Sequence, residues 1–229
     1  MVNKIITVEE AVTHIKDNMT LMIGGFLGAG SPHKIIQAIA DKGVTGLTII
    51  CNDTALPDKG IGILVTNKQV KKVITSHIGT NPNTVEQFNN KEIEVQFVPQ
   101  GTLAERIRCG GAGLGGVLTP TGIGTIVEEG KQKLTVYGKE YLLETALRAD
   151  VALLGASLGD ETGNLHYKGT TQNFNPMMAT AADVVIAEVQ ELVKPGEIAM
   201  ENVHTPGVYV QHLVRGCCLT FKAKPQPKL

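Results

Sequence analysis

The sequence has no long hydrophobic run and no excess of charge of either sign. Its longest apolar stretch, residues 21–30, is interrupted by glycines and is far shorter than the roughly 20 residues of a membrane-spanning helix. The N-terminus has no basic region followed by an apolar one, as a secretion signal would have. A formal net charge of −1 argues against a nucleic-acid-binding or membrane-surface patch. We therefore expect a protein of the cytoplasm that binds neither nucleic acid nor membranes.

Metal-binding patterns are also missing from the sequence. The four cysteines include no Cys-x-x-Cys spacing, and two of them are adjacent, which fits no zinc site. The six histidines contain no His-x-x-x-His pair. We therefore expect no metal site, and cysteines that stay reduced, as they do in the cytoplasm. With 42% hydrophobic residues, the chain of 229 residues is long enough for one large domain with a buried core.

The most informative stretch, residues 21–32, begins as a buried strand, becomes a glycine turn and then opens a helix. Ser31 is predicted to cap this helix and Pro32 to occupy its first position, where its missing N–H costs nothing. Isoleucines at helical spacing form an apolar face, and Gly43 is predicted to end the helix. Free N–H groups at such a helix start attract a phosphate or a carboxylate. The sequence therefore predicts an anion-binding turn at the carboxyl end of a strand.

The spacing of these glycines matches neither of two familiar phosphate loops. The turn reads Gly25-x-x-Gly28-x-Gly30, the reverse of the dinucleotide fingerprint, and no Gly-Lys-Ser/Thr triplet occurs in the sequence. By itself the turn names no ligand, and a tight turn without any ligand is an equally good interpretation.

Strands and helices alternate along the rest of the chain. Capping boxes at Thr7–Glu10 and Thr102–Glu105, and the pair Asn81-Pro82, each predict a helix start. Apolar or alternating runs predict strands at residues 47–51, 73–78, 94–98, 151–156 and 184–189.

This alternation indicates an α/β fold with a single open, mostly parallel sheet and helices on both faces. The domain is predicted to span residues 1–221, followed by a frayed tail at 222–229. The glycine-rich segment 110–124 is predicted to be an extended loop, with a short hairpin near 134–137. Ligands of such sheets bind beyond the carboxyl ends of the strands, where both the glycine turn and residues 99–102 are expected to lie.

Longer motifs carry a more specific signal. They are Asp17-Asn18 with Gly24-Gly25-Phe26, Gly30 and Pro32; Asn52-Asp53-Thr54; residues 99–108, which begin Pro99-Gln100-Gly101-Thr102; and the segments 110–113, 119–122, 167–170, 173–176 and 205–208. From about Lys4 to Val214, these motifs resemble the A subunit of family I coenzyme A transferases. The resemblance is closest to A subunits that move CoA between acetate, butyrate and acetoacetate. It implies the CoA-transferase fold, of the NagB/RpiA-like kind.

The resemblance also implies that the chemistry is divided between two chains. Family members form a glutamyl-CoA thioester on a glutamate in a Glu-Asn-Gly motif of the B subunit, and this sequence contains no such motif. Glu201-Asn202, for example, is followed by Val203. We therefore expect no catalytic nucleophile here, a beta subunit that carries it, and an α₂β₂ assembly. Acyl-CoA and a short-chain carboxylate are the expected substrates, with no tightly bound cofactor.

Two segments receive roles from the resemblance. Gln100 would approach the partner's glutamate, while Gly101 and Thr102 would offer backbone N–H groups to an oxyanion. The glycine turn would bind CoA through seven residues, namely Gly24, Gly25, Phe26, Leu27, Gly28, Ala29 and Gly30. Considered without the resemblance, Gln100 could simply cap a turn.

Other candidates weigh less. Ser76, His77 and Asp53 can be drawn as a triad, but the sequence has no Gly-x-Ser-x-Gly elbow, and core or turn roles are favoured. Arg106 and Arg108 could reach a CoA phosphate, or they could be solvated helix positions.

Two alternative functions stay open at this point. A sugar-phosphate isomerase of similar architecture would carry its own catalytic acid and base. A non-catalytic effector-binding domain would use the glycine turn to sense a phosphorylated metabolite and would be attached to a DNA-binding helix pair, for which the chain leaves little room before its first capping box.

Overall fold

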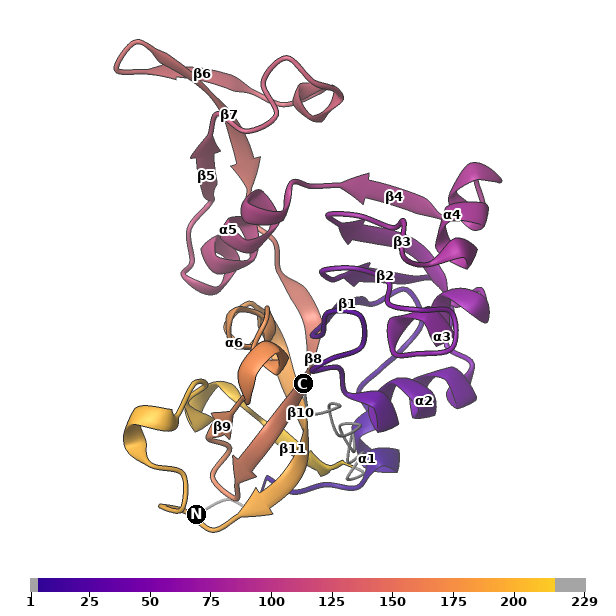
Figure 1. The fold of residues 1–229 in the computed structure, drawn as a ribbon, viewed down its shortest axis with the longest axis vertical. Helices are drawn as coiled ribbons and strands as arrows, with labels where there is room; N and C mark the ends of the chain where they lie inside the picture. Colours follow the sequence, from indigo (N-terminus) through magenta and orange to yellow (C-terminus); the bar gives the residue numbers. More distant parts are fainter. Residues whose placement is uncertain (1–3, 217–229) are drawn as a thin grey trace, which may run out of the picture.

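A computed structural model describes residues 4–216, which form a large parallel sheet with a small antiparallel lobe (Figure 1). The large sheet has the strand order β11-β10-β8-β1-β2-β3-β4, and all of these neighbours are parallel; β9 pairs with β8 in the antiparallel sense. Its strands are β1 (Thr20–Ile23), β2 (Leu47–Ile50), β3 (Val70–Thr75), β4 (Glu94–Phe97), β8 (Ala149–Asp160), β9 (Leu165–His166), β10 (Ala182–Val193) and β11 (His212–Arg215). The predicted α/β class is therefore confirmed.

Helices cover both faces of this sheet. They are α1 (Val8–Thr13), α2 (His33–Lys42), α3 (Ile61–Thr66), α4 (Pro82–Asn89), α5 (Gln100–Gly111) and α6 (Asn175–Met178), with short 3-10 turns at Ile126–Glu128, Gly169–Thr171, Met200–Asn202 and Gly207–Tyr209. Successive strand residues point to opposite faces. Leu21 and Ile23 therefore join one core cluster with α1, α2 and α3, whereas Met22 joins a second one with α5 and α6. Because both faces are covered, β8 and β10 read as continuous apolar runs.

Local capping signals gave accurate helix starts in two places. The Thr7 and Glu10 side chains form the complete capping box of α1, and the Asn81 side chain accepts from the backbone N–H groups of Asn83 and Thr84 at the start of α4. The third signal was wrong. Helix α5 begins at Gln100, two residues before the predicted cap Thr102, because the Leu103 N–H already donates to the Pro99 carbonyl.

The glycine-rich segment is more ordered than predicted. Helix α5 continues through Gly111, and β5 (Gly116–Thr119) then pairs with β7 (Lys139–Thr145) instead of forming a loop. The hairpin predicted near 134–137 is present: β6 (Lys133–Val136) returns into β7 through Tyr137 and Gly138, both with positive φ. Likewise, β3 occupies 70–75 and not 73–78. The sequence patterns missed these limits because strand pairing, and not local propensity, sets them.

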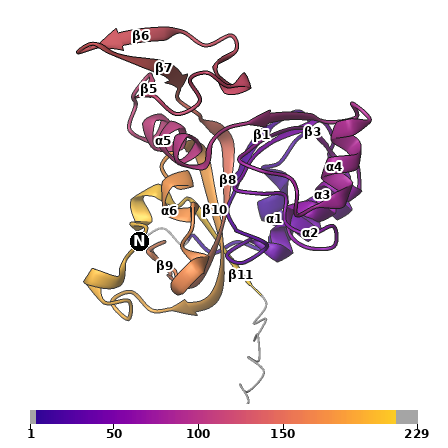
Figure 2. The same cartoon turned by 45° about the horizontal axis from the view of Figure 1, so that its top comes forward.

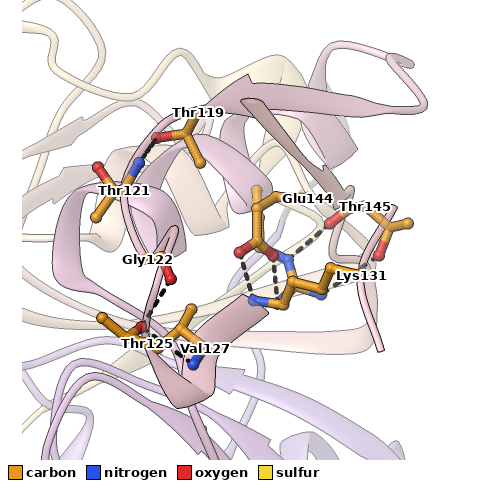
Figure 3. A network of polar contacts seen from close by, with 9 residues as sticks. Thr119, Thr121, Gly122, Thr125, Val127, Lys131, Glu144 and Thr145 are labelled. Carbon is orange, nitrogen blue, oxygen red and sulfur yellow. Dashed lines mark hydrogen bonds and ion pairs between the residues drawn. The ribbon is translucent and has the colours of Figure 1, made fainter. Parts of the chain in front are cut away.

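The antiparallel lobe projects away from the main sheet, above α5 (Figures 1 and 2). A buried ion cluster attaches it. Glu144 of β7 contacts the Lys131 ammonium, as Figure 3 shows, and lies 3.6 Å from the Arg106 guanidinium of α5. Arg106 also donates to the Thr145 carbonyl at 2.7 Å. Backbone and threonine contacts hold the loop after β5, with the Thr125 hydroxyl donating to the Gly122 carbonyl (Figure 3).

Within residues 4–216, no helix is long and apolar enough to cross a membrane. In the same range, no group of three or more His, Cys, Asp or Glu side chains is placed to hold a metal ion. The predicted tail at 222–229 lies outside the described residues, as do Cys217 and Cys218, whereas Cys51 and Cys109 are buried thiols.

Candidate active-site crevice

The glycine turn follows β1, the strand between β8 and β2 in the large sheet. Three of its glycines have no room for a side chain, and at Gly30 a Cβ would lie 2.5 Å from the Thr171 carbonyl oxygen. A Cβ at Gly24 would overlap the Asn175 side chain, and one at Gly25, where φ is +127°, would overlap the Ser31 hydroxyl. The turn therefore lies at the carboxyl end of a central parallel strand, where α/β sheets bind their ligands.

The helix start after this turn differs from the prediction. Ser31 does not cap α2; its hydroxyl donates to the Gly24 carbonyl at 3.0 Å, and the helix begins at His33. The end of the helix was predicted correctly, since Gly43 adopts the left-handed conformation there.

The protein's own carboxylate occupies the anion site that the sequence predicts at this helix start. Glu188 of β10 accepts hydrogen bonds from the backbone N–H groups of Lys34 at 2.8 Å and Ile35 at 3.1 Å. Burial raises the pKa of Glu188, while these two hydrogen bonds oppose that rise. The start of α2 therefore binds an internal anion, and the expectation of a ligand at these N–H groups was wrong. Sequence spacing could not show this, because Glu188 is more than 150 positions away along the chain.

Side chains from two other segments hold the turn in place. The Gly25 N–H donates to the Asn173 side chain at 3.1 Å, and the Asn175 amide donates to the Gly30 carbonyl at 3.0 Å. The Leu27 N–H donates to Asp53 at 3.1 Å, which fixes Leu27 at a φ of +49°. Phe26 and Leu27 are each 42% exposed at the tip. The turn is thus preorganised, with two apolar side chains presented to solvent.

A chain of hydrogen bonds joins the glycine turn to Gln100. The Gln100 amide nitrogen donates to the Asn52 side-chain oxygen at 2.6 Å, and the Asn52 amide donates to the Gly25 carbonyl at 3.0 Å. Asn52 follows β2 and is fully buried, whereas Gln100 is exposed. The glycine turn and the segment that contains Gln100, which the sequence predicted as separate candidates, are therefore adjacent in the structure. Asn52 belongs to the motif Asn52-Asp53-Thr54, but the sequence predicted no role for it. Its position at the carboxyl end of a strand was the feature that could have indicated a role in the site.

Gln100 is also the first residue of α5. Since the first intrahelical bond runs from the Leu103 N–H to the Pro99 carbonyl, the N–H groups of Gln100, Gly101 and Thr102 face out of the helix end. No acceptor for them occurs among the described residues. An amide side chain and a set of backbone donors are therefore presented together, and such donors can stabilise a developing oxyanion.

Gln100 borders a pocket of 390 Å³, whereas Gly101 and Thr102 line a neighbouring pocket on the lobe side of α5. The lining residues of the Gln100 pocket are Phe26, Asn52, Gln100, Thr170, Asn173, Phe174 and Met177. None of them is charged, and none is a carboxylate, a thiol or an amine; the one hydroxyl is that of Thr170. The pocket can therefore bind and polarise a carbonyl compound, but it offers no charged nucleophile to attack it.

The other candidates do not assemble into a site. The Ser76 hydroxyl lies 3.0 Å from His77 Nδ1, but Asp53 accepts from Leu27 and Ala55 instead of His77, so there is no triad. Arg108 is half exposed and pairs with Glu105 at 2.8 Å, as a surface helix residue does.

Arg106 fits neither of the two interpretations that the sequence left open. It is buried, and its guanidinium contacts Glu144 and the Thr145 carbonyl, so it is not a solvated helix position and lies on the lobe side of α5. Burial lowers the pKa of Arg106, and the neighbouring carboxylate counteracts this. Sequence periodicity could not identify this arrangement, because the partner strand β7 covers the helix only in the tertiary structure.

Comparison with known proteins shows the family. The family model described as Coenzyme A transferase matches residues 5–216. The acetate CoA-transferase subunit alpha of Escherichia coli K12 is 52% identical over 214 residues, which are 93% of this chain and 97% of that protein. The acetoacetyl-CoA:acetate/butyrate CoA transferase alpha subunit of Clostridium acetobutylicum is 53% identical over 215 residues, covering 94% and 99%. The chain belongs to the coenzyme A transferase family.

Solved structures agree with this assignment. An acyl-CoA transferase of Escherichia coli O157:H7, solved as a thioester complex with CoA, superimposes with a TM-score of 0.83 at 25% identity. The match covers 92% of this chain and 46% of that one, so this chain spans about half the length of that protein. Glutaconate coenzyme A-transferase of Acidaminococcus fermentans shares the fold at 17% identity, with a TM-score of 0.83 and coverage of 93% and 76%. Family membership decides against the isomerase and effector-domain alternatives.

Proposed function

We propose that this chain is the alpha subunit of a short-chain CoA-transferase, which exchanges CoA between an acyl-CoA and acetate, butyrate or acetoacetate. The observation that carries the proposal is the hydrogen-bonded link from Gln100 through Asn52 to the Gly25 carbonyl. It joins the exposed amide of Gln100, the first residue of α5, to the glycine turn, whose Phe26 lines the same uncharged pocket. Relatives named as alpha subunits of acetate and butyrate CoA-transferases, more than half identical over nearly their whole length, support the substrate class.

The missing nucleophile is a glutamate of the beta subunit's Glu-Asn-Gly motif. Its carboxylate attacks the acyl-CoA carbonyl and releases CoA thiolate, forming an acyl-glutamyl anhydride. The thiolate then attacks the glutamyl carbonyl, which releases the carboxylic acid as its anion and leaves a glutamyl-CoA thioester. The same steps in reverse transfer CoA to the second carboxylate. The thioester is not lost by hydrolysis, because the nucleophile in each step is already bound at the site.

The part of this chain is electrostatic. Negative charge develops on a carbonyl oxygen in each addition step, and preorganised donors stabilise it. The amide of Gln100 and the N–H groups of Gly101 and Thr102 are the candidates, since they lie at the start of α5, where the backbone N–H groups have no acceptor among the described residues. The glycine turn, Gly24 to Gly30, is the proposed contact of CoA itself. CoA is a substrate in this proposal, no tightly bound cofactor is required, and the reaction takes place in the cytoplasm.

The test is to purify this chain alone and together with a beta subunit, and to measure CoA transfer from acetoacetyl-CoA to acetate and butyrate. We expect activity only in the mixed preparation. Borohydride added with acyl-CoA is expected to modify the beta subunit and to leave this chain unmodified. Transfer by this chain alone, or a covalent adduct on one of its own glutamates, contradicts the proposal.

A further inference from the structure

The pocket beside Gln100 has two chemically different sides. Helix α5 contributes the amide of Gln100, whereas the segment that leads into and forms α6 contributes Phe174 and Met177. Both helices lie on the same face of the sheet, where they share the second core cluster (Figure 2). A carbonyl group at the amide would therefore leave its hydrocarbon end beside a phenyl ring and a thioether.

The apolar side is held rigidly. Asn175, which is fully buried, donates to the carbonyls of Gly30 at 3.0 Å and Thr171 at 2.9 Å and thereby ties α6 to the glycine turn. Phe174 is only 8% exposed, and Met177 is partly buried against the second core cluster. The wall is thus preformed by Phe174 and Met177, which both border the core and the pocket, and Met177 is the more exposed of the two.

Charge also restricts what can enter. None of the pocket's lining residues carries a charge. A second carboxylate on the acyl chain would lose water there without gaining a cation, which is strongly unfavourable. An unbranched chain without a charged end would instead gain apolar contact, and methionine adapts well to such chains because it is long and flexible.

We propose that Met177 is a specificity-determining residue, whose side chain packs against the hydrocarbon end of the acyl group and limits the length of chain that the enzyme accepts. This inference rests on the proposed function. By this inference the alpha subunit contacts the acyl chain through Met177, and these contacts are separate from the hydrogen-bond donors that act on the carbonyl group.

The experiment uses the assembled enzyme with its beta subunit and measures kcat/KM for acetate, butyrate, hexanoate and succinate as CoA acceptors. Met177→Ala removes the far end of the side chain, and we expect the hexanoate-to-acetate ratio to rise by about tenfold, the effect of one or two methylenes in an apolar pocket. Met177→Leu is expected to change the ratio less. Met177→Lys is expected to raise the succinate-to-butyrate ratio, since it supplies a cation. Met200→Ala is the matched control, because Met200 is 91% exposed.

The outcomes separate this inference from the function on which it rests. If the unaltered enzyme transfers CoA and the acceptor ratios of folded Met177→Ala and Met177→Lys stay within twofold of it, only the role of Met177 is refuted. An equal loss for all acceptors refutes it too. If Met177→Ala does not assemble, the succinate-to-butyrate ratio of Met177→Lys decides: a rise supports the role of Met177, and a ratio within twofold of the unaltered enzyme refutes it. If the unaltered enzyme transfers CoA to none of the monocarboxylates, the proposed function fails and this inference with it.

Discussion

Replacing Gln100 by alanine separates catalysis from stability in this protein. The side chain is exposed, and its single hydrogen bond runs to Asn52 at 2.6 Å. Its loss costs the fold about 1–3 kcal/mol, because the oxygen of the buried Asn52 side chain loses its donor, while alanine suits a helical position. Removal of one preorganised donor from a reacting carbonyl costs about 2.7–4 kcal/mol, or roughly 10²–10³ in kcat. We therefore expect an enzyme that folds and assembles normally but turns over 100-fold or more slowly.

Asn52 allows a sharper version of this test. If Asn52 acts by holding the Gln100 amide, Asn52→Ala also lowers kcat, and the double variant is no slower than Gln100→Ala alone. Steady-state kinetics of the four enzymes with acetoacetyl-CoA and acetate measure this coupling, and thermal unfolding and gel filtration check folding and assembly. Normal kcat in an assembled Gln100→Ala enzyme refutes the catalytic role. Effects that multiply in the double variant refute the coupling through Asn52.

Three further predictions concern the glycine turn, the buried carboxylate at the start of α2 and the ion cluster that attaches the antiparallel lobe. Gly25→Ala is expected to raise KM for acyl-CoA or to unfold the turn, since φ is +127° and no room exists for a Cβ, whereas Gly79→Ala, in open space, should leave kinetics and Tm unchanged. Burial raises the pKa of Glu188 in the folded protein, so Glu188 stabilises the fold most below its ordinary pKa, and this stabilisation is lost as the pH rises through the raised pKa. Urea unfolding at a series of pH values should therefore show the wild type losing stability relative to Glu188→Gln as the pH rises. Parallel pH profiles of the two proteins would contradict this. Glu144→Gln leaves the buried Arg106 guanidinium and the half-buried Lys131 ammonium without their carboxylate and should lower the free energy of unfolding by about 3–5 kcal/mol, whereas Arg108→Ala, at an exposed pair, should cost about 1 kcal/mol or less; equal effects would refute the distinction.

Local sequence signals predicted the elements that depend on neighbouring residues. The capping box at Thr7–Glu10, the Asn81 cap and the glycine that ends α2 all formed as expected, because each is a contact within a few positions of the chain. Continuous apolar runs predicted β8 and β10, because burial on both faces leaves no polar side to alternate with.

Sequence patterns gave wrong predictions where a distant segment hydrogen-bonds to the groups that the local pattern was expected to use. Ser31 has the chemistry of a helix cap, but its hydroxyl donates to the Gly24 carbonyl, which the fold brings within 3.0 Å. The glycine-rich segment after α5 looked unstructured, but pairing with β7 orders part of it as β5. In both places the deciding partner is supplied by tertiary structure.

The sequence by itself determined the class of the fold and the family, and it nominated the two segments that we propose as the site, since these depend on periodicity and on motifs of fixed spacing. Only the tertiary structure decided how the segments work together. Glu188 reaches the start of α2 from β10, and Asn52 joins Gln100 to Gly25 across strands that lie far apart in the chain. The physical reason is that a parallel sheet brings the carboxyl ends of distant strands to one edge, and contacts made there have no local signature in the sequence.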